Sequence, residues 1–562
     1  MKAGIVTSTS NPGGDVDPGH VRYTPTTRAI QTLGRLLLCL ATSISAWLVH
    51  LEGVPAITSQ PVALADWLTD GGDSARTAWQ ANEHALTSTS VRNLQLLWAL
   101  KLDSVPREMH ALRPALIAGK VATAAGPKQI AVVAGASDDL FGIDADTGVL
   151  LWTQRFDRGF SLPRNGLGFT TACPGGQTAT PVLAARGTSG DYTAYAVSWD
   201  GRLRSIDVAT GKVVNPPARF MPSNGKPSAL NLHDGVIYST TSNLCGENPN
   251  LVYAYDLETK VARSYSARGG GMWGRTGPSI SPNGLVFTGT GDGEFDPPRG
   301  LLGNAIVALA FDRRADTFAI KDYFAPSNAR LLLERDLDLS VTGPVFEHRG
   351  RQLLAQSSKE CRVWLLDTAA LGGGDRRTPL ASTPQFCNEQ LAYQSRGVWG
   401  ALATWEDNEQ RRWVVAPFWG PLATSFDPPG RHGDVADGGL AAFTVEAGGA
   451  ALVPRWISRD MNRAEPPVVA NGIVFAYASG ESTEQRSAGP RALEGTAARI
   501  AASTHATLYA FDGKTGDELW SSGSTIKSWN HFTGLSIANG RVYIGTYDGV
   551  LYCFGVDTEK TH

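Results

Sequence analysis

One pattern of apolar and polar positions recurs along the chain. An apolar strand ends in Asp, a Thr-Gly pair follows, and a second strand runs back to a Trp; the clearest copies are residues 140–148 with Trp152 and residues 508–516 with Trp520. Glycine adopts the positive φ of such a turn without steric cost, and the Asp can accept amide hydrogens of the turn. Each copy therefore predicts a β-hairpin, and we expect its Trp to pack on the neighbouring unit.

Strand ends that fit this pattern, closely or loosely, occur at eight positions: Asp144, Asp207, Asp256, Asp312, Asp367, Phe443, Asp512 and Phe554. A hairpin repeated in this way indicates an array of similar small sheets. Trp98 fits the outer strand of a unit whose inner strands come last in the sequence, at residues 541–554. Pairing of the two chain ends would close the ring and remove exposed sheet edges. The pattern predicts an all-β, eight-bladed β-propeller with tryptophan-docking repeats.

The composition agrees with many short strands joined by tight turns. The 562 residues include 62 Gly and 15 Trp, and long stretches with helical apolar spacing are scarce. The formal net charge is -3, with acidic and basic residues scattered along the chain. This distribution offers no charged surface for nucleic acid or anionic lipid, so we expect neither as a partner.

The N-terminal region predicts export. Residues 36–51 are almost wholly apolar, Arg28 and Arg35 precede them, and the Ala-Leu-Ala of residues 63–65 follows. A short apolar run before small residues is typical of a signal peptide. We expect residues 1–65 to be a disordered leader with a signal peptide, and residues 66–562 to be a single propeller that is periplasmic or secreted and has no membrane span. An uncleaved N-terminal anchor is the alternative.

Five cysteines follow the predicted cleavage site. An exported protein can keep disulfides, and although spacing leaves the connectivity open, we expect Cys173 with Cys245 and Cys361 with Cys387. Cys553 lies inside an apolar strand and is expected to be a buried, inert thiol. The sequence has no C-x-x-C-H motif, so we expect no covalently attached haem.

Several motifs carry a resemblance to a known family. The mature chain opens on residues 66–73, and Val-Arg-Asn-Leu at 91–94 precedes Trp98; later come Gly-Gly-Met-Trp-Gly at 270–274 and Gly-Thr-Gly-Asp at 289–292. In these motifs and their order, over residues 66–554, the chain resembles the pyrroloquinoline quinone (PQQ) propellers, which include quinoprotein alcohol dehydrogenases. The resemblance implies a PQQ cofactor in the axial funnel and a Ca²⁺ ion that polarises the quinone.

The resemblance also assigns roles to particular residues. Trp273 matches the floor on which the quinone stacks, Lys359 the basic residue that contacts the quinone oxygens, and Trp399 a further tryptophan of the pocket. Each has a plainer interpretation, because Trp273 could pack between blades and Lys359 could form a surface ion pair with Glu360. In the region of Lys359 and Trp399, we expect the disulfide at Cys361 to hold loops that face the funnel.

Three acidic residues complete this set. Asp292 falls at a metal-ligand position where the family usually has Asn, and a carboxylate suits Ca²⁺. Asp336 and Asp338 lie where the family has its catalytic Asp. Asp292 could instead be a turn residue, and the other two could belong to a solvated charged loop. His531 and other isolated histidines are expected to be structural.

The chain also departs from the family. No two cysteines are adjacent, so the disulfide lid over the quinone is missing, and the glutamate of the Ca²⁺ site has no clear counterpart. The nearest polar candidate, Asp200, lies in an ordinary repeat turn.

Two hypotheses on function follow. The first is a quinone-dependent dehydrogenase that oxidises an alcohol or sugar with non-covalent PQQ and Ca²⁺ and passes electrons to an external acceptor. The second is a non-catalytic scaffold that binds partner proteins, similar to the propeller lipoprotein of the barrel-assembly machinery. Insertions at 420–439 and 481–504 resemble recognition loops and favour the second hypothesis.

Overall fold

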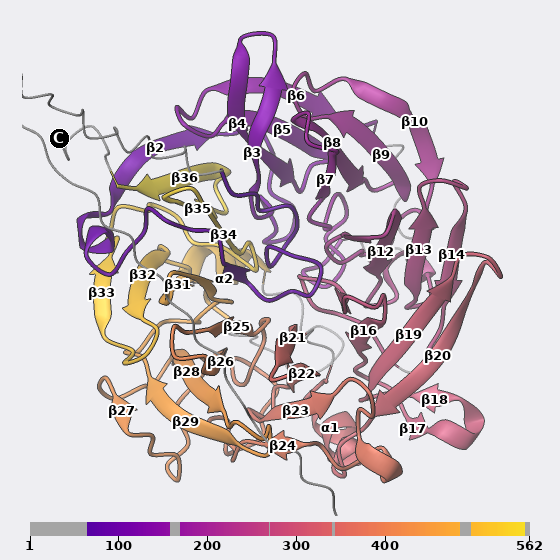
Figure 1. Ribbon diagram of the computed structural model, residues 1–562, viewed down its shortest axis with the longest axis vertical. Helices are drawn as coiled ribbons and strands as arrows, with labels where there is room; N and C mark the ends of the chain where they lie inside the picture. The colour runs from indigo at the N-terminus through magenta and orange to yellow at the C-terminus, as the bar shows by residue number, and fades with distance from the viewer. Residues whose placement is uncertain (1–63, 158–168, 269, 340–342, 484–495, 557–562) are drawn as a thin grey trace, which may run out of the picture. The chain divides into compact units, whose positions relative to one another are not determined.

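Eight small antiparallel sheets follow one another around a ring (Figure 1). The structure is a computed structural model that describes residues 64–157, 169–268, 270–339, 343–483 and 496–556. All of these belong to one compact unit, Val62–His562. The predicted eight-bladed β-propeller is confirmed. The predicted leader and signal peptide lie almost entirely outside the described residues, so the division of the chain at residue 65 stays a prediction.

Each blade has four main strands, which follow one another from the ring axis outward. The first four blades are β3 (Leu116–Thr123), β4 (Gly126–Gly135), β5 (Asp139–Asp144) and β6 (Leu150–Arg155); β7 (Val182–Arg186), β8 (Asp191–Val197), β9 (Arg202–Asp207) and β10 (Val213–Arg219); β11 (Asn231–His233), β12 (Val236–Thr240), β13 (Val252–Asp256) and β14 (Ala262–Tyr265); and β15 (Ser279–Ile280), β16 (Val286–Gly289), β19 (Ile306–Asp312) and β20 (Thr317–Phe324).

The other four blades continue in chain order. They are β21 (Val345–His348), β22 (Arg351–Ser357), β23 (Val363–Asp367) and β24 (Ala381–Ser382); β25 (Ala403–Glu406), β26 (Arg412–Trp419), β28 (Gly438–Val445) and β29 (Leu452–Ile457); β30 (Val468–Ala470), β31 (Ile473–Ala478), β32 (Thr507–Asp512) and β33 (Glu518–Ser521); and β34 (Leu535–Ala538), β35 (Arg541–Gly545), β36 (Val550–Gly555) and β2 (Gln95–Lys101).

Short elements complete the described part of the chain. β1 (Trp79–Gln80) and β27 (Gly430–Arg431) add parallel pairs to β30 and β29, and β17 (Phe295–Asp296) pairs with β18 (Leu301–Leu302). Two short α-helices, α1 (Ala329–Arg335) and α2 (Thr496–Ala502), lie between blade strands together with 3-10 turns η1 (Ser90–Asn93), η2 (Cys245–Glu247), η3 (Pro297–Arg299) and η4 (Gly373–Asp375). None of the described helices is long and apolar enough to cross a membrane.

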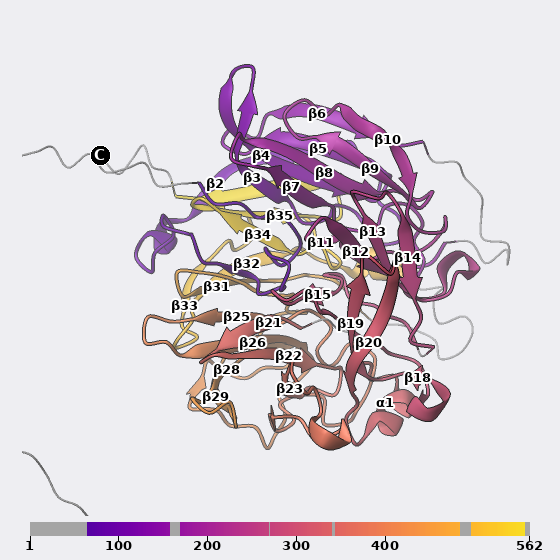
Figure 2. The ribbon, with the colours of Figure 1, turned by 45° about the vertical axis from the view of Figure 1, so that its right-hand side comes forward.

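The last blade joins the beginning of the propeller to its end. β2 pairs antiparallel with β36, and Trp98 lies opposite Cys553. Figures 1 and 2 show β2 beside the yellow strands of the chain's end; the second view, Figure 2, is turned by 45° from Figure 1. The predicted ring closure is confirmed. Cys553 is fully buried in this blade, as expected.

The third strand of most blades ends where the repeat pattern predicted. β5, β9, β13, β19, β23 and β32 end at the six Asp residues of the pattern, while Phe443 and Phe554 lie inside β28 and β36. At Asp144, one carboxylate oxygen accepts hydrogen bonds from the amides of Asp146 and Thr147, at 3.1 and 3.2 Å. The Asp therefore shapes the turn, as the sequence indicated.

Residues 67–80, which we call the plug segment, circle the axis inside the ring and bond to every blade in turn. The main-chain partners of this segment are Ile117, Leu183, Ile280, Val345, Thr404 and Val469, at 2.8–2.9 Å. Side chains complete the circle, because Thr69 donates to the carbonyl of Leu230 and Gln80 to that of Ile537. The inner edge of each blade would otherwise present unsatisfied backbone groups, so the plug segment caps these edges.

Candidate functional site

A cavity of about 370 Å³ opens at one end of the ring axis. It is lined by loops that precede the innermost strands and by loops that join second to third strands. All eight blades contribute, through Arg113, Thr178, Ser228, Arg275, Asp338, Trp399, Thr483 and His531, among others. The plug segment lies beneath it, since Asp70 forms a buried ion pair with Arg275 of the cavity wall. We call this the axial cavity.

The six residues that the sequence singled out all line this one cavity: Trp273, Asp292, Asp336, Asp338, Lys359 and Trp399. They come from five different inter-strand connections, from β14–β15 to β24–β25. The structure therefore brings together residues that are up to 126 positions apart in the sequence. The role of each stays a prediction.

Three carboxylates form an acidic cluster on one side of the cavity. One ligand oxygen each from Asp292, Asp336 and Asp338 lies within 4.8 Å of the others. Lys359 is their positive partner: its Nζ lies 2.7 Å from Asp338 Oδ2 and 3.1 Å from Asp336 Oδ1. Lys359 is 3 % exposed and is not half of a surface pair with Glu360, which instead bonds Arg362.

Local backbone geometry explains how the acidic cluster forms. Asp336 ends α1 in the left-handed conformation (φ 54°), where its amide bonds the carbonyls of the last helical turn. The helix end thus turns Asp336 toward Lys359. Gly291 lets Asp338 approach, because a Cβ at Gly291 would lie 2.4 Å from Asp338 Oδ1. The Gly-rich turn of the sequence is needed for close packing around this carboxylate.

The charges of the cluster shift one another. Burial acts to raise the pKa of Asp338, but the Lys359 ammonium and its hydrogen bonds outweigh it and hold that pKa below its usual value. Burial, followed by the negative charges of Asp338 and Asp336, raises the pKa of Asp292 to about 7. With three carboxylates and one ammonium, the cluster has negative charge left over that a cation would neutralise.

A series of aromatic rings extends from the acidic cluster along the cavity wall. Lys359 Nζ lies 5.1 Å from the ring centre of Trp273 and 4.5 Å from that of Trp399, within cation–π range. Trp399 stacks on Trp419 with centroids 5.2 Å apart, and Trp419 stacks on Phe532 at 5.7 Å. The cavity therefore offers a broad aromatic surface to a flat ligand.

Another part of the cavity wall is rich in basic side chains, which the sequence alone did not indicate. We call it the basic wall; it comprises His110, Arg113, Lys226, Arg275, Arg499 and His531. The Nε atoms of Arg113 and Arg275 are buried without a hydrogen-bond partner among the described residues. The six side chains come from five separate inter-strand connections, and no sequence motif marks them. Only the closed ring places them together.

Two disulfides hold loops at this cavity. Cys173 pairs with Cys245 and Cys361 with Cys387, as the sequence suggested. The first lies beside Ala172 and Asn243 of the cavity wall. Next to the second, Asn388 Nδ2 donates to the carbonyl of Lys359 at 2.7 Å, so this disulfide supports the loop that carries Lys359.

Other sequence candidates lie away from the cavity or serve packing. Asp200 pairs with Arg204 in its repeat turn and does not line the axial cavity. In the insertion at 420–439, Leu422, Ala423, Phe426 and Val435 are buried in the core. The described ends of the insertion at 481–504 bring Thr483 and Arg499 into the axial cavity. The described parts of both insertions are thus at least partly packed against the propeller, and a role as recognition loops stays a prediction.

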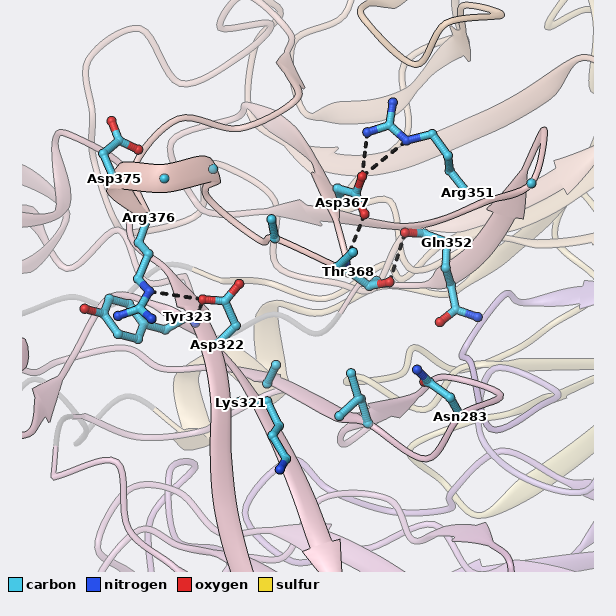
Figure 3. Close-up of a pocket in the computed structure, with 17 residues that line it drawn as sticks. Asn283, Lys321, Asp322, Tyr323, Arg351, Gln352, Asp367, Thr368, Asp375 and Arg376 are labelled. Atoms are coloured by element: carbon cyan, nitrogen blue, oxygen red, sulfur yellow. Dashed lines mark hydrogen bonds and ion pairs between the residues drawn. The ribbon is translucent and has the colours of Figure 1, made fainter.

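A larger hollow, of about 1100 Å³, lies between the blades of β20 and β23 (Figure 3). Its charged side chains neutralise one another: Arg376 pairs with Asp322 at 3.2 Å and Arg351 pairs with Asp367. Figure 3 shows these pairs on the walls of the hollow. Because both of its paired arginines, Arg351 and Arg376, already have carboxylate partners, this hollow is a weaker candidate than the axial cavity.

Comparison with solved structures supports the fold. A quinohemoprotein alcohol dehydrogenase from Comamonas testosteroni aligns with a TM-score of 0.52 and 14 % identity, over 87 % of this chain and 80 % of that one. A europium-containing methanol dehydrogenase aligns with a TM-score of 0.54 and 12 % identity, over 87 % of this chain and 98 % of that one. No protein-family model and no curated protein matches the sequence. At these identities the likeness establishes the shared propeller fold.

Proposed function

We propose that the protein is a quinone-dependent dehydrogenase that oxidises an alcohol or sugar in the axial cavity. The observation that carries this proposal is the cluster of Asp292, Asp336 and Asp338 around Lys359, at a surface formed by two tryptophans. The solved relatives of this fold include an alcohol and a methanol dehydrogenase. The disulfides agree with a location outside the cytoplasm, periplasmic or secreted.

The residues present fit PQQ, a flat orthoquinone with three carboxylates. Trp273 and Trp399 line the cavity with their ring centroids 5.6 Å apart, and this aromatic surface suits a flat ligand. Arg113 and Arg275 of the basic wall supply guanidinium donors for carboxylates. A cavity of about 370 Å³ lies in the range typical of small-ligand sites.

The acidic cluster likewise fits a hard divalent cation such as Ca²⁺, for which carboxylate oxygens are the preferred ligands. Asp292 and Asp336 would hold it, while Asp338 stays paired with Lys359 at 2.7 Å. A bound quinone would supply a two-electron acceptor, the cation would polarise its carbonyl, and an external acceptor would reoxidise the quinone.

Reconstitution with PQQ and Ca²⁺ tests the proposal. Quinone binding is followed by absorbance, and turnover by dye reduction that depends on an added alcohol or sugar. We expect tight binding that is lost in Trp273→Ala and Lys359→Met and a loss of Ca²⁺ affinity in Asp292→Asn. Lys321→Met, in the second hollow, is the matched control for Lys359→Met and should bind normally. Absence of binding at micromolar quinone would contradict the proposal and favour a non-catalytic scaffold.

A further inference from the structure

Of the two carboxylates that the resemblance suggests as base, Asp336 and Asp338, Asp338 already accepts hydrogen bonds at both oxygens. Asp338 Oδ2 accepts hydrogen bonds from Trp273 Nε1 at 2.9 Å and from Lys359 Nζ at 2.7 Å. Its Oδ1 accepts the amide of Asp292 at 3.2 Å. Protonating Asp338 would break its buried ion pair with Lys359, so its geometry suits a structural anchor better than a proton acceptor.

The basic wall contains a histidine, His531, that has one ring nitrogen left free, within the described part of the chain, to accept a proton. His531 Nδ1 lies 2.7 Å from Glu481 Oε2, and both side chains are buried. Arg499 forms an ion pair with the other oxygen of Glu481, so both carboxylate oxygens have a partner. An ionised carboxylate only accepts, so His531 Nδ1 carries the proton and Nε2 carries the lone pair.

The neighbouring histidine is held in the other tautomer. His110 Nε2 lies 3.1 Å from the carbonyl oxygen of Thr171, and its Nδ1 lies 3.2 Å from Arg113 Nη2. A carbonyl only accepts and a guanidinium only donates, so both nitrogens of His110 are used. His531 Nε2 has no hydrogen-bond partner among the described residues, although the ring lines the axial cavity.

The surroundings keep the His531 ring neutral. Burial lowers the pKa of His531, Arg499 and Lys226 lower it further, and Glu481 opposes them. The rings of His110 and His531 meet edge to face with centroids 4.8 Å apart, and Arg113 faces His110 from the far side. A neutral imidazole with one nitrogen fixed by a carboxylate is the usual form of a histidine general base.

We propose that His531 is the proton acceptor for a hydroxyl-bearing ligand in the axial cavity, with Glu481 and Arg499 as positioning residues. The reaction in which it acts rests on the proposed function. There the substrate O–H bond breaks as the Nε2–H bond forms, and the electron pair left on oxygen makes the C=O bond. The hydrogen on carbon leaves with its two electrons, which reduce the orthoquinone.

Chemical modification tests His531 without any turnover. Diethyl pyrocarbonate acylates an unprotonated, accessible imidazole nitrogen, and mass spectrometry identifies the modified residue. We expect rapid modification of His531 and at least tenfold slower modification of His348. His348 is similarly buried, but its Nε2 bonds the carbonyl of Glu446 at 2.9 Å, and its Nδ1, which has no partner among the described residues, is fully buried. An unreactive His531 in protein whose exposed His84 reacts would overturn the proposal.

Turnover gives the second readout. In His531→Gln we expect PQQ affinity within threefold of wild type and a fall in kcat of about 10²–10⁴-fold, the usual contribution of a general base. Glu481→Gln should shift the pH profile of kcat and lower kcat less than His531→Gln does. His348→Gln should leave kcat and its pH profile unchanged. Activity of His531→Gln within threefold of wild type would overturn the proposal.

The two proposals fail in different ways. A protein that binds no quinone contradicts the proposed function, and ¹⁵N NMR of its histidines still decides whether His531 can accept a proton. A proton on Nδ1 of His531 and none on Nε2 supports that role. A proton on Nε2 overturns it.

Discussion

The indole of Trp152 lies directly on Gly211 of the next blade: a Cβ at Gly211 would come within 2.6 Å of the ring. The Trp152 Nε1 donates to the carbonyl of Val208, at 2.9 Å. Trp98 meets Gly148 and Ala145 in the same way, and Trp456 meets Gly516 and Gly513. Each of these three Trp residues thus packs on the Thr-Gly turn of the following blade.

Substitution of Gly211 by Ala should therefore destabilise the protein. The added methyl would clash with Trp152 and would also sit at a φ of +70°. We expect a loss of about 2–4 kcal/mol in the free energy of unfolding, measured by chemical denaturation. Gly235→Ala is the matched control, since Gly235 has a φ of +75° and open space around it. Equal losses in the two variants would show that the Trp contact contributes nothing.

The plug segment depends on one buried arginine. Arg76 is 1 % exposed and donates to Thr69 Oγ1 at 2.6 Å, to the carbonyl of Leu230 at 3.2 Å and to that of Pro278 at 3.3 Å. Arg76→Ala removes these buried hydrogen bonds and leaves Thr69 Oγ1 without its donor, so we expect the unfolding free energy to fall by about 3 kcal/mol or more. Arg92→Ala, at an exposed position, is the control. A change below about 1 kcal/mol would contradict this account of the plug segment.

Lys226 should be reactive at moderately alkaline pH. Burial, with help from Arg113, lowers the pKa of Lys226 to about 8, because both disfavour its positive charge. Its amine therefore becomes nucleophilic as pH rises through about 8. Acylation with an N-hydroxysuccinimide ester, followed residue by residue by mass spectrometry, should show that midpoint, and bound PQQ should protect it. The exposed Lys120 serves as an internal control for the reactivity of the ester at each pH. Labelling of Lys226 that follows Lys120 at every pH would refute the prediction.

Asp256 should make stability sensitive to acid. The two guanidinium bonds from Arg313, at 2.6 and 2.8 Å, lower the pKa of Asp256 to about 2 from its usual 3.8. A depressed carboxyl pKa stabilises the fold above the unfolded value, and this contribution is lost as pH falls from about 4 to about 2. Asp256→Asn should lower stability at pH 7 by about 1.5 kcal/mol and flatten the loss below about pH 4. Denaturation curves across the acid range up to neutral pH test this; identical slopes for both proteins would contradict it.

The disulfide of Cys361 and Cys387 should support both stability and ligand binding. Replacing both cysteines by Ala should lower the unfolding free energy by about 2–4 kcal/mol, because the unfolded chain gains entropy when the cross-link is removed. It should also weaken PQQ binding, since the loop of Lys359 loses a constraint beside Asn388. Denaturation and quinone titration measure the two effects. Cys553→Ala, in the buried β36, is the control and should leave quinone affinity unchanged.

Local signals in the sequence were enough to establish the repeat, the number of blades and the ring closure. These signals are an apolar strand, an Asp that accepts turn amides, a glycine at positive φ, and a Trp at a fixed offset. Trp98 could be paired with the chain's end because its strand had no partner nearby in the sequence. The resemblance also identified Trp273, Asp292 and Lys359, because these residues lie within short recognisable motifs.

Only the folded ring determines which residues fill the axis and which residues form the basic wall. The plug segment bonds to all eight blades in turn, and no local pattern predicts contacts of that range. Arg113, Lys226, Arg275 and His531 are single residues on separate loops, and they form one wall because the ring brings those loops together. The sequence indicated a structural role for His531 because the residue is isolated. Its partner Glu481 lies 50 residues away, so no local motif contains both. Its chemistry depends on a contact that exists only in the closed propeller.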